Sequence, residues 1–327
     1  MNAAVTRHPS KWWLSGGVAP VVTLLVALSG ARAETPVIEV GGWWNGQGER
    51  VVDDQVMAGL ERADVILLGE VHDSAAIHRR QVELLDTLRS AGRPVVLAME
   101  QLDRRDDDDV DRMNVDSLAG GRERAEAGGF DFDGWGWDQY GRLFDWAAQH
   151  RAPLWPLNLS REKAMAVAMA DGDEWRDQMD GGTLAWIDDL APSLSLPDEQ
   201  QDELIDVLER SHCQEIPSSM SSRMLRAQVA RDLVMAEAIM AARDAHPDHR
   251  VVAVMGNQHA RLDRGVGYWL SRLAEDERPS IMSVGMVPIN HLDGAPEAED
   301  AFDLMWVAPE VMRDDPCAAV GEDGDEE

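Results

Sequence analysis

The chain has 327 residues and a formal net charge of −31, with 61 acidic residues against 30 lysines and arginines. A surface this acidic repels nucleic acid and anionic lipid, which argues against both as partners of the protein. The length is sufficient for one large α/β domain with a helical insertion, or for two domains.

The first 33 residues are organised like a secretory signal peptide. Arg7 and Lys11 precede an apolar segment at residues 18–28, and residues 31–33 have the small-x-small form that signal peptidase requires. This apolar segment is shorter than the roughly 20 residues that span a bilayer, which disfavours a membrane anchor. We therefore expect a periplasmic or secreted protein that begins near Glu34 and has no stable membrane insertion.

Cleavage of the signal peptide would make the chain still more acidic. Residues 1–33 hold three basic residues and no acidic ones, so 27 basic and 61 acidic residues would remain, a net charge of −34. Lys163 would be the one remaining lysine. This composition indicates halophilic adaptation, because salt screens the repulsion among acidic groups. The alternative is ordinary acidity concentrated in disordered segments, such as the acidic tail at residues 313–327.

Short apolar runs predict the strands of a mainly parallel sheet. They lie at residues 37–40, 65–69, 95–99, 154–157, 251–255, 281–287 and 304–307. Between the second and third runs, Ile77, Leu84, Leu85 and Leu88 recur at helical spacing. Strands that alternate with helices in this way indicate βαβ units and therefore a parallel sheet.

The stretch between residues 157 and 251 contains helical patterns and no convincing strand. Helices are predicted near residues 184–190, 198–208 and 221–242, separated by glycine and proline residues. We expect this insertion, at about residues 159–247, to form a helical lid over the edge of the sheet. An aromatic cluster precedes it, and this cluster is either core packing or the wall of a ligand cavity. Its members are Trp135, Trp137, Tyr140 and Trp146.

Polar side chains follow three of the predicted strands. They are Glu70 and His72 after the run at 65–69, Glu100 after 95–99, and Asn257, His259 and Arg261 after 251–255. Because ligands of open α/β sheets bind beyond the carboxyl ends of the strands, we expect these groups to share one site. Carboxylates with imidazoles suit either a divalent metal ion or general acid and base chemistry. The chain has no HExxH motif, G-x-S-x-G elbow or phosphate loop, so serine hydrolases and nucleotide enzymes are unsupported.

The chain contains two cysteines, Cys213 and Cys317. An exported protein reaches a compartment that permits disulfides. Cys317, however, lies in the tail rich in Gly, Asp and Glu, which is typical of disorder. We therefore expect two free thiols rather than a disulfide.

Seven motifs follow one another over roughly residues 60–275. They are LLGEVHD with His78 and Gln81, VLAMEQLDR at 96–104, WGWDQY at 135–140, LNLSR at 157–161, SHCQEIP at 211–217, AQVARDLVMA at 227–236 and GNQHARLDRGVGYWL at 256–270. Together they resemble the ChaN-like haem-binding uptake proteins of the wider Tiki and erythromycin-esterase superfamily. The resemblance implies a three-layer α/β/α domain over residues 34–312 with a mainly parallel sheet and a helical lid.

The resemblance also implies an exported protein that binds haem in haem or iron uptake, although it does not by itself decide between a binder and an enzyme. We expect a non-enzymatic haem-binding protein, and haem shared between two chains would make a homodimer. Carried over by position, its pocket comprises Glu70, His72, His78, Glu100, His212, His259 and Arg261. Known haem-binding relatives use tyrosine ligation, and this chain has only Tyr140 and Tyr268. In the lid, His212 next to Cys213 is the more suggestive ligand, and an arginine such as Arg261 would pair with the haem propionates.

Two features depart from the family pattern, and one rival function stays open. Gly265-Val266-Gly267 stands where family members often have Gly-Val-Pro, and no lipobox precedes the expected mature chain. The rival is a hydrolase, either metal-dependent or using general-base catalysis. In that case Glu70 or Glu100 would activate water, while His72 and His259 would bind a divalent metal or transfer protons.

Overall fold

The structure, a computed structural model, describes residues 38–105, 108–213, 216–292, 301–313 and 317. The expected signal peptide lies outside the described residues, as does the acidic tail apart from Arg313 and Cys317. In the part of the chain that is described, no helix has the length and apolar character needed to cross a membrane.

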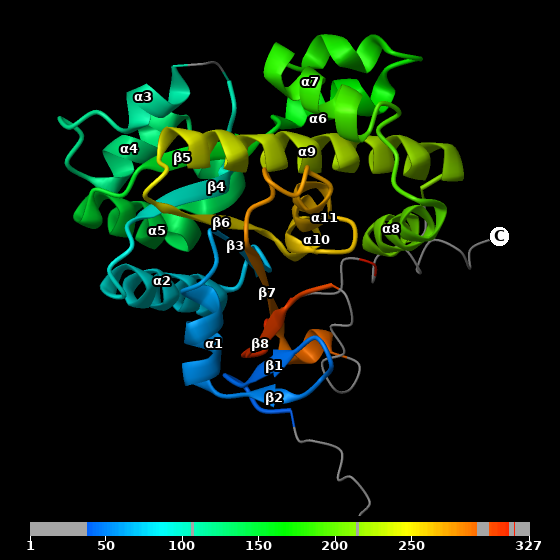
Figure 1. Cartoon of the computed structure of the whole chain (residues 1–327). Coiled ribbons are helices and arrows are strands. Elements are labelled where there is room, and N and C mark those ends of the chain that lie inside the picture. Colours follow the sequence, from blue (N-terminus) through cyan, green and yellow to red (C-terminus); the bar gives the residue numbers. More distant parts are fainter. Residues whose placement is uncertain (1–37, 106–107, 214–215, 293–300, 314–316, 318–327) are drawn as a thin grey trace, which may run out of the picture. The chain divides into compact units, whose positions relative to one another are not determined.

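An eight-stranded sheet runs through the described chain (Figure 1). Its strands are β1 (Trp43–Asn45), β2 (Arg50–Val51), β3 (Val65–Glu70), β4 (Val95–Asp103), β5 (Leu154–Asn158), β6 (Arg250–Gly256), β7 (Ile281–Pro288) and β8 (Leu304–Ala308). The strand order is β2-β1-β8-β7-β3-β6-β4-β5. The strands from β8 to β5 in this order are parallel, and β1 and β2 add an antiparallel hairpin at one edge.

Helices cover both faces of the sheet (Figure 1). One face carries α1 (Asp53–Leu60), α2 (Ala75–Ser90), α3 (Asp109–Met113), α4 (Gly121–Gly128) and α5 (Trp137–His150). The other carries α6 (Arg161–Met169), α7 (Gly181–Leu190), α8 (Asp198–Ser211), α9 (Ser218–Ala245), α10 (Asn257–Ala260) and α11 (Val266–Ser271). Three short helical turns complete the elements: η1 (Phe132–Gly136), η2 (Glu174–Gln178) and η3 (Ile289–His291). The expected three-layer α/β/α fold with a mainly parallel sheet is confirmed.

The alternation of side chains along β3 shows why the sheet needs helices on both sides. Ile66 and Leu68 pack in the core beneath α1 and α2, whereas Val65 and Leu67 pack in the core beneath α9. All four side chains are fully buried. Successive residues of a strand point to opposite faces, so an unbroken apolar run requires cover on both.

The order of the strands in the sheet makes neighbours of three strands that are far apart in the sequence. β6 lies between β3 and β4, although it comes much later in the chain, beginning at Arg250. Glu70 at the end of β3 is in register with Gly256 at the end of β6. The carboxyl ends of β3, β6 and β4 are therefore neighbours.

Six of the seven predicted strands are confirmed, and the prediction for the first run, at residues 37–40, is wrong. Residues 38–40 of the run at 37–40 are not in a strand, and the sheet begins instead at Trp43. Trp43 and Trp44 pair with both β2 and β8, and a turn at Asn45 and Gly48 reverses the chain. The hairpin escaped prediction because a strand of two residues has no measurable apolar alternation.

The expectation of two free thiols is also wrong. Cys213 and Cys317 form a disulfide, with their Cα atoms 5.4 Å apart. Val311 and Arg313 are held as well: the side-chain amide of Asn290 pairs with the backbone of Val311, and Arg313 forms an ion pair with Asp73. Composition indicates the flexibility of an isolated tail, but it does not register anchors supplied by distant residues.

Candidate functional site

Two buried carboxylates lie at the carboxyl ends of β3 and β4. Glu70 is 2% exposed and Glu100 is 1% exposed. A buried carboxylate is stable only when hydrogen bonds or opposite charges replace its lost hydration. The identity of those partners therefore defines the site.

Glu70 is surrounded by hydrogen-bonding partners from three elements and from the turn after β3. Its Oε1 lies 2.9 Å from Nδ1 of His72 and accepts from the Gln101 amide at 3.0 Å and the Tyr140 hydroxyl at 2.5 Å. Its Oε2 accepts from the Gln81 amide at 3.0 Å and lies 3.4 Å from Nε2 of His78. Burial alone would raise the pKa of Glu70, but the contacts with His72 and His78 bring this pKa far below its ordinary value. Glu70 is therefore ionised at neutral pH.

Tyr140 supports Glu70 rather than facing solvent. Its side chain is fully buried in α5, and its ring lies 4.6 Å from the ring of His78. Burial and the charge of Glu70 raise the pKa of Tyr140 well above 10. The phenol therefore stays protonated and donates a hydrogen bond to the carboxylate.

Replacing Tyr140 by phenylalanine removes this donor and leaves a buried negative charge with one partner fewer. We expect Tyr140→Phe to lower the free energy of unfolding by about 2 kcal/mol, as measured by chemical denaturation. Tyr268→Phe is the matched control, because among the described residues the Tyr268 hydroxyl has a hydrogen bond only with the exposed Arg272, at 3.4 Å. We expect that control to change stability by less than about 0.5 kcal/mol. Equal effects of the two variants would contradict a supporting role for Tyr140.

Glu100 has a separate set of partners, mostly from α9 and β6. Its Oε1 accepts from Nη2 of Arg231 at 2.7 Å, and its Oε2 accepts from the backbone of Gly256 at 2.6 Å. Nε2 of His259 lies 3.5 Å from Oε1, and Nδ1 of His259 lies 2.5 Å from Asp232. Although burial would raise the pKa of Glu100, the charges of His259 and Arg231 lower it. Burial raises the pKa of Asp232.

His72 is the member of the site that solvent reaches. Its side chain is 46% exposed, and no residue of the described chain hydrogen-bonds to its Nε2. A Cβ atom on Gly256 would lie 3.1 Å from this ring, so a glycine at the end of β6 makes room for the imidazole. Trp135 packs edge-on against the ring at 5.1 Å. Burial would lower the pKa of His72, but the hydrogen bond to Glu70 and the charge of Glu100 raise it above 6.5.

The structure places the nine sequence-predicted site residues in two groups. It brings together Glu70, His72, His78, Glu100, Tyr140 and His259. The other three have different partners: His212 is exposed at the end of α8 with Nδ1 2.8 Å from the Leu208 carbonyl, Arg261 pairs with Asp263, and Tyr268 contacts Trp269 and Arg272. None of these three has a hydrogen bond or ion pair with Glu70 or Glu100 in the described chain.

Sequence reasoning missed Gln101, Arg231 and Asp232, and also Gln228, whose side-chain amide nitrogen lies 3.1 Å from Nδ1 of His259. Arg231 and Asp232 stand inside a helix between Val229-Ala230 and Leu233-Val234, and these four apolar neighbours are all buried. Two adjacent charges flanked by apolar residues on both sides are a signal of buried, paired charge. Gln101 offered no such signal, since an amide at a strand end is commonly solvated. Within the described residues, no group of three or more His, Cys, Asp or Glu side chains is arranged to hold a metal ion.

Comparison with known proteins gives a family and a fold. Residues 56–270 match the family described as haem-binding uptake, Tiki superfamily, ChaN. No curated protein matches the chain at a significant level. A solved structure that describes cofacial haem binding to ChaN of Campylobacter jejuni has 19% identity and a TM-score of 0.62, covering 81% of this chain and 95% of that one. An erythromycin esterase, EreC, in its open conformation has 12% identity and a TM-score of 0.46, covering 84% and 99%.

The family match spans both carboxylates, all the donors around them and the whole of α9. The similarity to the Campylobacter protein shows that the two chains share a fold. This chain belongs to the ChaN family of haem-binding uptake proteins in the Tiki superfamily.

Proposed function

We propose that the protein is exported and binds haem as part of haem or iron uptake, with His72 as the iron ligand. The family supports the choice of haem. The observation that carries the proposal is the half-exposed imidazole of His72, whose Nδ1 is fixed by a buried carboxylate while Nε2 has no partner among the described residues. Export rests on the signal-like residues 1–33, and the acidic composition supports a salt-adapted surface.

The residues present fit haem. Haem iron accepts a histidine ligand, and a metal-binding histidine ordinarily donates its other ring N–H to a carboxylate or carbonyl. Glu70 fills that role for His72, which orients the ring and increases the basicity of Nε2. Trp135 supplies an apolar surface beside it. His78 and His259 are buried and engaged by Glu70, Glu100 and Asp232, so we assign them to the support of the carboxylates.

Titration of the purified protein with haemin tests the proposal. We expect a saturable Soret band, and His72→Ala should raise the dissociation constant for this haem at least tenfold, a change of about 1.4 kcal/mol. Ligation needs the neutral imidazole, and the pKa of His72 is raised above 6.5. The affinity should therefore increase as pH rises through that raised pKa.

His150→Ala is the matched control, because His150 contacts Asp86 and Trp146 and no member of the site. This control should titrate like the unaltered protein. Absence of any saturable Soret band would overturn haem binding itself. A normal affinity in His72→Ala would overturn only the ligand, and variants of Tyr268 and His212 would then be titrated in the same way.

Haem bound through an exposed histidine leaves its second face uncovered. A second copy of the chain can cover such an apolar face, giving a symmetric dimer. Cofacial haem binding is described for the Campylobacter protein. We extend the arrangement to this chain as part of the proposal, with a haem-dependent increase in molecular mass as its sign.

The contact between Glu70 and His72 also supports general-base hydrolysis as a second candidate. A carboxylate that orients an imidazole is a recurring arrangement of acid and base catalysts. In that case His72 would take a proton from water while Glu70 stabilises the imidazolium. Ester turnover that disappears in Glu70→Gln, with folding intact and no Soret band in the unaltered protein, would favour this candidate over haem uptake.

A further inference from the structure

The imidazole of His72 lies close to both buried carboxylates of the site. Its Nδ1 is 2.9 Å from Oε1 of Glu70. A Cβ atom on Gly256 would lie 3.1 Å from Nε2 of His72 and 3.6 Å from Oε2 of Glu100, so these two atoms are within about 7 Å of each other. Unit charges interact strongly over such a distance where protein replaces water. Both carboxylates therefore act on any positive charge that His72 carries or binds.

The protonation of His72 shows the direction of this effect. Burial and the charge of Arg231 lower the pKa of His72, but the hydrogen bond to Glu70 and the charges of Glu100 and Glu70 raise it by more, to above 6.5. Arg231 thus offsets only part of the negative charge, which it meets at Oε1 of Glu100. The site stabilises a positive charge at this imidazole.

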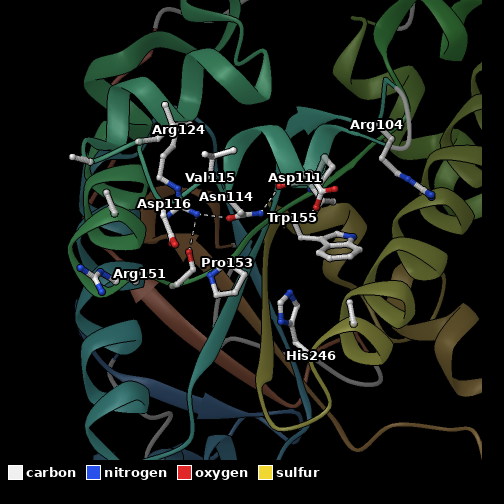
Figure 2. Close-up of a pocket in the computed structure, with 17 residues that line it drawn as sticks. Arg104, Asp111, Asn114, Val115, Asp116, Arg124, Arg151, Pro153, Trp155 and His246 are labelled. Atoms are coloured by element: carbon white, nitrogen blue, oxygen red, sulfur yellow. Dashed lines mark hydrogen bonds between the residues drawn. The ribbon is translucent and has the colours of Figure 1, made fainter.

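A cavity of about 1060 Å³ beside β5 provides a comparison within the same chain (Figure 2). Neither buried carboxylate of the site lines it. Its Asn114 side chain is occupied by the backbone of Leu154, from which it accepts at 2.8 Å and to which it donates at 2.9 Å. Charges of both signs line it in balance, with Arg124 and Arg151 against Asp111 and Asp116. The cavity therefore does not favour a positive ligand.

His246 lines that cavity and responds in the opposite way to His72. Its ring packs edge to face with Trp155 at 6.0 Å, and its side chain has no hydrogen bond or ion pair among the described residues. Burial and the charge of His249 lower the pKa of His246. The carboxylates beside His72 account for the difference between the two imidazoles.

The oxidation state of a haem iron bound at His72 would change the positive charge there by one unit. Ferric iron carries the larger charge, so buried carboxylates stabilise it more than ferrous iron. A carboxylate that accepts the N–H of a ligating histidine also makes the other ring nitrogen a stronger donor to the metal. Glu70 acts through this hydrogen bond, and Glu100 acts through its charge.

We propose that Glu70 and Glu100 make the His72 site selective for ferric haem, so that reduction of the iron weakens binding and favours release. The proposal rests on the proposed function for the haem and its ligand. A one-electron donor, such as a reduced flavin, converts ferric iron into ferrous iron. The bond lost on release is the one between iron and Nε2 of His72, and no covalent bond of the protein breaks.

Separate titrations with ferric haemin and with dithionite-reduced haem, the latter under argon, test the selectivity. We expect the unaltered protein to bind the ferric form about 100-fold more tightly. Affinity and reduction potential are linked by a thermodynamic cycle, so the potential of the complex should lie about 120 mV below that of free haem in the same buffer. Spectroelectrochemical titration of the complex measures this potential independently.

Charge-removing variants test the two carboxylates. Glu70→Gln and Glu100→Gln should each lower the affinity ratio about tenfold, which raises the potential by about 59 mV. Glu100→Asp retains the charge and should retain the selectivity. Asp64→Asn is the matched control, because Asp64 precedes β3 and lies about 20 Å from Glu70 along the strand. It should leave the ratio unchanged.

Tyr140→Phe should change the potential in the opposite direction. The Tyr140 hydroxyl donates to Oε1 of Glu70, the oxygen that also meets Nδ1 of His72. Without this competing donor, Glu70 accepts more strongly from His72, and the potential should fall. A rise in Glu70→Gln together with a fall in Tyr140→Phe is a pattern that general damage to the site does not produce.

The outcomes separate this inference from the proposed function. Equal affinities for ferric and ferrous haem in the unaltered protein would overturn the selectivity and leave haem binding intact. A ratio unchanged in both glutamine variants would overturn the role of the carboxylates. Loss of selectivity in His246→Ala would also overturn it, because the haem would then lie in the cavity beside β5. No Soret band with either form would overturn the proposed function itself.

Discussion

Cys317→Ser should lower the free energy of unfolding by about 4 kcal/mol. The disulfide with Cys213 closes a loop with a sequence separation of 104 residues, and a crosslink across so long a loop removes much conformational entropy from the unfolded chain. Cys213 follows α8 and Cys317 lies beyond β8. Urea denaturation monitored by tryptophan fluorescence measures the loss.

The bond itself, rather than either side chain, should account for this effect. Cys213→Ser, Cys317→Ser and the double variant should therefore lose the same stability, and reducing the unaltered protein with dithiothreitol should reproduce it. Reduction that leaves the unfolding midpoint unchanged would show that the crosslink does not contribute to stability. Losses that add up in the double variant would point instead to separate packing roles for the two residues.

Arg231→Met should cost about 3 kcal/mol or more at neutral pH. Arg231 is the arginine that contacts Glu100, which is 1% exposed, and removing one member of a buried pair leaves the other charge uncompensated. Arg272→Met is the control for loss of an exposed arginine, with an expected change of less than about 0.5 kcal/mol. Chemical denaturation of both variants gives the comparison.

The pH dependence identifies the charge responsible. The pKa of Glu100 in the folded protein lies below its ordinary value of 4.5, so its ionised form contributes stability above about pH 4.5 that is lost as the pH falls through the folded pKa. Without Arg231 this pKa rises, and the deficit of the variant should shrink as the pH falls and Glu100 becomes neutral. Glu100→Gln should likewise restore part of the stability lost in Arg231→Met. A deficit independent of pH would mean that Arg231 acts through packing alone.

Patterns local to the chain were sufficient to predict the fold class and part of the site. The apolar runs at β3, β4 and β6 are buried on both faces, and that burial requires the unbroken hydrophobicity that identified them. The same runs placed Glu70 and Glu100 at strand ends. The family resemblance added the assignment of His78 to the pocket and the suggestion that Tyr140 belongs to the site.

What escaped prediction depends on contacts between distant segments. No local pattern states that β6 inserts between β3 and β4, and that insertion is what brings Gly256 and His259 to Glu100. The pairing of Cys213 with Cys317 depends on the path of the chain after β8.

The side-chain amide of Asn114 covers the outer edge of β5, because it accepts from the Leu154 N–H and donates to the Leu154 carbonyl. This cover bears on aggregation at high protein concentration. The unpaired edge of a sheet is where folded copies recruit one another into aggregates. Here one outer strand, β2, has only two residues, and the other, β5, has its Leu154 backbone groups occupied by a side-chain amide and a proline two residues later. Neither outer strand of the described sheet offers a long template for growth, so crowding alone does not favour sheet-to-sheet polymerisation of the folded protein. Asn114 thereby favours solubility by occupying backbone groups of an edge strand, although its side chain is uncharged.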